Sequence, residues 1–171
     1  MAILAQLRQL GAWVDSIGAQ VLLDEDAAAA WAAERRPLHG LVYDGAEPFG
    51  RGGASGLDET LRLAWLATRA LANGALIPAE APAKIVLVAP RAGSGAHDEA
   101  ARAGLENLAR TLSVEWARFG VTVVAVCPGP TTADQELAEL VAFLLSRAGE
   151  YFTGCRFDLG AVTDSPLIPA S

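Results

Sequence analysis

The sequence is short of basic residues, and it has no long apolar run. Only 13 Lys and Arg stand against 20 Asp and Glu, which gives a net charge of −7 in 171 residues. Nucleic-acid binding needs clustered basic side chains, so this composition argues against a nucleic-acid partner. No window reaches the roughly 18 uninterrupted apolar residues of a membrane span, and the first residues resemble no signal peptide. We therefore expect neither nucleic acid nor membrane as a partner.

Cysteine is also scarce. The two cysteines, Cys127 and Cys155, lie in apolar, strand-like contexts. Buried, reduced thiols in a cytoplasmic protein explain this most simply. With 52% hydrophobic residues and a mean hydropathy of +0.29, the chain is too apolar to be disordered. Its length fits one domain over residues 1–171.

Alanine-rich stretches alternate with short β-branched runs, a pattern typical of α/β proteins with a mostly parallel sheet. Asp24 or Asp26 is placed to cap the second helix, and Asp58 to cap the third, which Asn73-Gly74 closes. A short strand is expected at either 13–17 or 20–23, and the residues do not choose between them. The spacing predicts further strands over 38–43, 85–89, 121–126 and 151–159. It predicts helices over 2–10, 27–34, 58–72, 98–119 and 135–147.

Several segments resemble the short-chain dehydrogenase/reductase family. ARAGLENLARTLSVEWARFGVTVVAVCPGP is similar to its long helix, following strand and Pro-Gly turn, and FLLSRAGEYFTGCRFDLG to its closing segment. LHGLVYDGA resembles the strand that ends in Asn-Asn-Ala-Gly, and TLRLAWLATRAL the helix after it. The match runs from about Leu7 to Gly160. The resemblance implies a Rossmann-like three-layer sandwich whose shortened, mostly parallel sheet has about five strands.

The family's catalytic residue types are missing. The resemblance places Thr60, Pro90, Asp98 and Arg102 where the family has its Asn, Ser, Tyr and Lys. An aspartate beside Arg102 remains ionised at pH 7 and is a poor acid. Pro90 offers an oxyanion neither a hydroxyl nor an amide hydrogen. We therefore expect no catalytic residues at these positions.

The family's cofactor site also lacks counterparts. Its first strand, TGxxxGxG turn and helix, which face the pyrophosphate, have no match in this chain. Gln20 falls near the family's adenine-contacting Asp, and Tyr43-Asp44 replaces its Asn-Asn. Most of the substrate-covering lid is skipped between Pro128 and Leu137. No cofactor is therefore expected.

An alternative places a displaced phosphate cradle in the glycine-rich loop Gly45–Gly56, with Arg91 selecting a 2′-phosphate. A flexible surface loop is the favoured interpretation, because isolated glycine spacings are weak signals. If the alternative holds, the cofactor is NAD(P). The candidate cofactor-binding residues are then Gly45, Gly50, Gly52, Arg91, Pro128 and Gly129.

The remaining polar signals favour structural roles. Asp98 and Glu99 are expected to cap the long helix rather than bind a metal with His97, and Asp98 is placed to pair with Arg102 on the helix surface. His39 lacks ligand partners at metal-site spacing, and Cys127 has no base nearby, so both are expected to be structural. The residues leave open whether Trp65 and Trp116 belong to the core or to an interface.

The leading hypothesis is a non-catalytic relative of short-chain dehydrogenases that works as an oligomer subunit. It would pair with itself, or with an intact dehydrogenase, through the helices 58–72 and 98–119 and the strand 151–159. A shortened sheet would also leave an edge that something must protect. The alternatives are a divergent NAD(P)-dependent oxidoreductase with a rebuilt cofactor site, and a binding module for an unrelated small molecule.

Overall fold

The computed structural model describes residues 2–50 and 52–160, and these hold a four-stranded, fully parallel sheet. The strand order is β1 (Gly40–Asp44), β2 (Ala83–Val88), β3 (Val121–Pro128), β4 (Arg156–Leu159). The register aligns Val42 with Val86 and Val86 with Val124 across the first three strands. The continuous β-branched runs of β2 and β3 are almost wholly buried, as expected of parallel strands covered on both faces.

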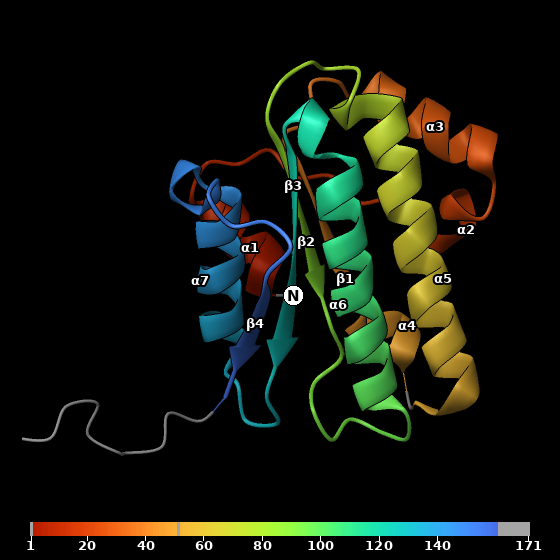
Figure 1. The fold of residues 1–171 in the computed structure, drawn as a ribbon, viewed down its shortest axis with the longest axis vertical. Coiled ribbons are helices and arrows are strands. Elements are labelled where there is room, and N and C mark those ends of the chain that lie inside the picture. Colours follow the sequence, from red (N-terminus) through yellow and green to blue (C-terminus); the bar gives the residue numbers. More distant parts are fainter. Residues whose placement is uncertain (1, 51, 161–171) are drawn as a thin grey trace, which may run out of the picture.

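Helices cover both faces of the sheet, which makes three layers (Figure 1). One face is covered by α1 (Ala2–Gln9) and α7 (Asp134–Leu145), which pack side by side. The other is covered by α5 (Gly53–Leu71) and α6 (Asp98–Glu115), with α3 (Glu25–Glu34) packed against α5. Because strand side chains alternate, Val86 and Val88 enter the first core while Ile85 and Leu87 enter the second. The predicted α/β fold class is confirmed.

Several predicted helix ends are confirmed by their local geometry. Asp24, one of the two proposed caps, accepts a hydrogen bond from the Ala27 N–H at 3.0 Å, where α3 begins. Gly11 follows α1 with φ +86°, and Gly120 follows the 3₁₀ turn Ala117–Phe119 with φ +71°. Both are left-handed conformations that glycine adopts without strain.

The prediction of a fifth strand, at 13–17 or 20–23, is wrong. Residues 12–18 have no regular secondary structure, and 19–22 form the short helix α2 (Ala19–Leu22). The connection from α1 to α3 passes from one face of the sheet to the other without pairing with a strand. Trp13 is 69% exposed there, while Leu22 packs into the core beside Ala28.

The glycine-rich loop is shorter than predicted. It contains the short helix α4 (Ala46–Phe49), and α5 begins at Gly53, so Asp58 lies inside the helix and is no cap. The predicted helix end at Asn73-Gly74 is also wrong, because α5 continues into a π-helical turn over Ala72–Leu76. Buried Ala75 and Leu76 hold this extra turn against the core. The last strand begins at Arg156 rather than at Tyr151.

Candidate functional site

Ligands of open parallel α/β sheets usually bind beyond the carboxyl ends of the strands. The structure brings the residues singled out in the sequence to this end. Gly45 follows β1, Pro90 and Arg91 follow β2, and Pro128 and Gly129 lie at the end of β3. Whether these residues can bind a ligand depends on which of their polar groups are not already hydrogen-bonded within the protein.

Arg102 is the central side chain of this region. It lies in α6 and is only 4% exposed. Its Nη1 donates to the carbonyl oxygens of Pro90, at 3.0 Å, and Pro128, at 2.7 Å. Its Nη2 lies 3.6 Å from an Asp158 carboxylate oxygen, and its Nε lies 3.4 Å from Glu99. One buried cation therefore connects the ends of β2, β3 and β4 to α6.

Asp98 does not pair with Arg102, so the expected surface ion pair is wrong. Its Oδ2 instead accepts the N–H of Gly93 at 2.5 Å and closes the turn after β2. The N-cap position of α6 is held by His97 in a left-handed conformation, without a side-chain cap. Asp98 and Glu99 both lie in the first helical turn, where negative charge complements the helix dipole.

Thr60 lies in the core and faces no open site. It is fully buried, and its Oγ1 has no hydrogen-bond partner among the described residues. The Tyr43 hydroxyl donates to the Thr60 carbonyl oxygen at 2.7 Å. Burial raises the pKa of Tyr43 above its usual value, which makes this phenol a poor proton donor near neutral pH. This hydrogen bond joins the Tyr43 side chain of β1 to the main chain of α5.

The glycine N–H groups after β1 are already used within the protein. Those of Gly45, Gly50, Gly52 and Gly53 donate to backbone carbonyl oxygens at 2.7–3.1 Å. A phosphate cradle presents free N–H groups to the anion. In this conformation the N–H groups of these four glycines are not free to bind a phosphate.

The other candidate cofactor residues are engaged as well. Arg91 donates to the Thr132 carbonyl oxygen and pairs with Asp134 at 2.5 Å, which ties the loop after β2 to the start of α7. The Gly129 N–H donates to the Leu159 carbonyl oxygen at 2.6 Å. These contacts join neighbouring loops to one another.

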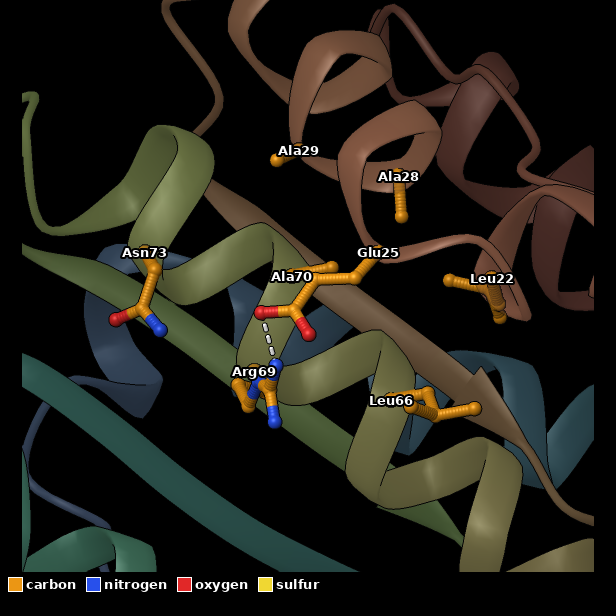
Figure 2. Close-up of a pocket in the computed structure, with 8 residues that line it drawn as sticks. All are labelled: Leu22, Glu25, Ala28, Ala29, Leu66, Arg69, Ala70 and Asn73. Atoms are coloured by element: carbon orange, nitrogen blue, oxygen red, sulfur yellow. Dashed lines mark ion pairs between the residues drawn. The ribbon is translucent and has the colours of Figure 1, made fainter.

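Neither of the two main hollows on the described residues lies at this end of the sheet. One, of about 50 Å³, lies between α3 and α5 beside the Glu25–Arg69 ion pair (Figure 2). It has room for water rather than for a dinucleotide. The other is a shallow hollow of about 490 Å³ before β1. It is lined by Trp13, Asp15, Glu34, Arg35, Arg36 and Pro37.

Cys127 is fully buried in β3, as expected of a core thiol, and burial raises its pKa. Cys155 is half-buried before β4. His39 is exposed, and no group of three metal-ligating side chains occurs within residues 2–50 and 52–160. In the same part of the chain no helix is long and apolar enough to cross a bilayer.

The two tryptophans differ in burial, so one fits the core alternative and the other remains exposed. Trp116 is 9% exposed and belongs to the core, whereas Trp65 on α5 is 42% exposed. The helical pattern assigns no face to Trp116, because α6 ends at Glu115.

Sequence reasoning missed the partners of Arg102. Asp158 reaches it from β4, 56 positions along the chain, and Arg156 in the same strand pairs with Glu106 at 2.9 Å. No local signal identifies such pairs, because they depend on β4 lying beside β3. Chemically, the arrangement binds strand ends together and presents no free acid–base pair.

No protein-family model matches the chain, and no curated protein matches it. Solved structures do. The citronellol catabolism dehydrogenase AtuB of Pseudomonas aeruginosa PAO1 is 26% identical with a TM-score of 0.67, over 91% of this chain and 76% of that one. A short chain dehydrogenase from Mycobacterium smegmatis is also 26% identical with a TM-score of 0.67, over 93% of this chain and 75% of that one.

BdcA (YjgI) from E. coli shares the fold at 20% identity, with a TM-score of 0.62 over 90% of this chain and 75% of that one. The parallel sheet and its two helical layers, together with these neighbours, show that the chain has a Rossmann-like fold similar to that of short-chain dehydrogenases.

Proposed function

We propose that the chain is a non-catalytic relative of short-chain dehydrogenases that serves as a subunit of an oligomer. The observation that carries the proposal is that Arg102 is buried and hydrogen-bonded within the protein. The resemblance places it where the family has its lysine, and its guanidinium is buried and bonded to the carbonyl oxygens of Pro90 and Pro128. Moving it to serve a reaction would leave these acceptors unsatisfied.

The hydrogen bonds that the glycine N–H groups and Arg91 already make within the protein support the same proposal. A bound dinucleotide requires amide or guanidinium donors for its phosphates. In this chain the candidate donors hold the loops together. We therefore propose that no nicotinamide cofactor is needed for the role.

Exposed apolar side chains on the proposed contact surfaces support the oligomer role. They include Trp65 on α5, Val114 on α6 at 78% exposure, and Tyr151 before β4 at 84% exposure. Phe152 contacts Phe143 at a tilted angle and Phe157 edge to face, with ring centroids 6.0 and 5.3 Å away, and Phe143 is 40% exposed. Aromatic side chains of this kind often anchor protein interfaces.

The test is calorimetric titration with NADH and NADPH, on protein whose mass is fixed by light scattering, with an intact short-chain dehydrogenase as the positive control. The proposal expects no binding heat at millimolar cofactor. It also expects a dimer or larger species, or a stable complex with a coexpressed intact dehydrogenase. Micromolar cofactor binding would contradict it and favour a divergent oxidoreductase. A monomer that forms no such complex would also contradict it.

A further inference from the structure

We infer that two copies of the chain pair through the outer edge of β1 and so join their sheets into one. This inference rests on the proposed role as an oligomer subunit. It names the partner as a second copy, and it names a surface different from the outer faces of α5 and α6.

The outer edge of β1 carries free main-chain groups. The hydrogen bonds at both ends of the strand fix which residues face β2. Leu41 and Tyr43 face β2, so Gly40, Val42 and Asp44 direct their N–H and C=O groups away from it. Within residues 2–50 and 52–160 the structure gives these six groups no hydrogen-bond partner. Groups of this kind are a template for another strand.

The edge lacks the usual protection against pairing. Gly40–Asp44 contains no proline, lysine or arginine, and its register with β2 is continuous, without a bulge. The other edge of the sheet differs, because Arg156 and Asp158 of β4 place paired charges there. The paired charges of β4 therefore distinguish that edge from the edge at β1.

The edge is complementary to itself. A two-fold axis at Val42 would pair Val42 with its own copy and Gly40 with Asp44 in an antiparallel ladder. The six free groups of each copy would then meet the six of the other. The two valines would form a β-branched cross-strand pair. Isologous contacts of this kind close into a dimer.

Apolar side chains on the adjoining connection favour the same partner. Residues 10–23 lead from α1, on one face, to α3, on the other, around the β1 side of the sheet (Figure 1). This connection carries Leu10 at 65%, Trp13 at 69% and Leu23 at 46% exposure. A second copy at the edge would shield this apolar surface.

Light scattering and amide hydrogen exchange of the full chain test the inference. We expect a dimer at micromolar concentration, with the amides of Val42 and Asp44 protected and losing protection on dilution. A monomeric chain would overturn the inference, and so would a dimer whose Val42 amide exchanges as freely as an unbonded one. A chain that is monomeric alone yet binds an intact dehydrogenase would overturn this inference and leave the proposed function standing.

Two variants identify the surface. Val42→Pro removes one outward N–H and spares the ladder to β2, so we expect a folded monomer, verified by circular dichroism. Trp65→Glu on the outer face of α5 is the control, and we expect it to remain dimeric. A dimer that Trp65→Glu dissociates and Val42→Pro does not would overturn the inference and favour the helix faces. If Val42→Pro does not fold, the exchange of the unmodified chain decides.

Discussion

At the scale of single residues, Arg102 is a buried cation that links several elements of the fold. A buried charge is tolerated only where hydrogen bonds and opposite charges compensate for its lost hydration. Arg102 has two carbonyl acceptors and two carboxylates within 3.6 Å. Its Nη1 alone donates to both carbonyl oxygens, while Nη2 lies toward Asp158.

Arg102→Met should lower the free energy of unfolding by about 3 kcal/mol, because it leaves the carbonyl oxygens of Pro90 and Pro128 without their buried donor. The measurement is urea denaturation followed by circular dichroism. Arg110→Met is the matched control, since Arg110 is 63% exposed and pairs only with Glu106 in the described part of the chain. It should cost less than about 1 kcal/mol. Equal losses in the two variants would contradict the structural role.

At the scale of elements, the short strand β4 depends on side chains as well as on its ladder to β3. It has four residues, and Arg156 ties it to Glu106 of α6 at 2.9 Å. The hydrogen bond from Arg156 is the main cause that holds the pKa of Glu106 below its ordinary value of 4.5. Because the native pKa is the lower one, the ionised carboxylate stabilises the folded chain.

This stabilisation should be present above pH 4.5 and lost as the pH falls through the lower native pKa of Glu106. Glu106→Gln should therefore be less stable than the unmodified chain at pH 7, with a difference that shrinks in acid. Denaturation at a series of pH values measures it. Glu115→Gln, an exposed change at the end of α6, should be neutral throughout. A Glu106→Gln difference that is constant with pH would refute the linkage.

At the scale of the whole molecule, the sheet has one charged edge and one open edge between two helical layers. Association stabilises the native state, because only the folded chain presents the paired surface. The melting temperature should then rise with protein concentration. Scanning calorimetry at low and high micromolar concentration measures this, and Val42→Pro should remove the dependence. A melting temperature independent of concentration in the unmodified chain would argue against self-association.

The sequence by itself determined the α/β class, the main helices and the buried strands, because these follow from local patterns of apolar residues. The valine run of β3 and the Asp24 cap of α3 are examples. It stays a prediction from the resemblance that the positions of the family's catalytic residues are occupied by Thr60, Pro90, Asp98 and Arg102.

Only the tertiary structure decided how those positions are used. Arg102 lies near Asp158 because β4 lies beside β3, and residues 13–17 form an irregular connection that pairs with no strand. The open edge of β1 follows from the strand order. Contacts between residues distant in sequence carry no local signal, so the fold had to be known before these roles could be assigned.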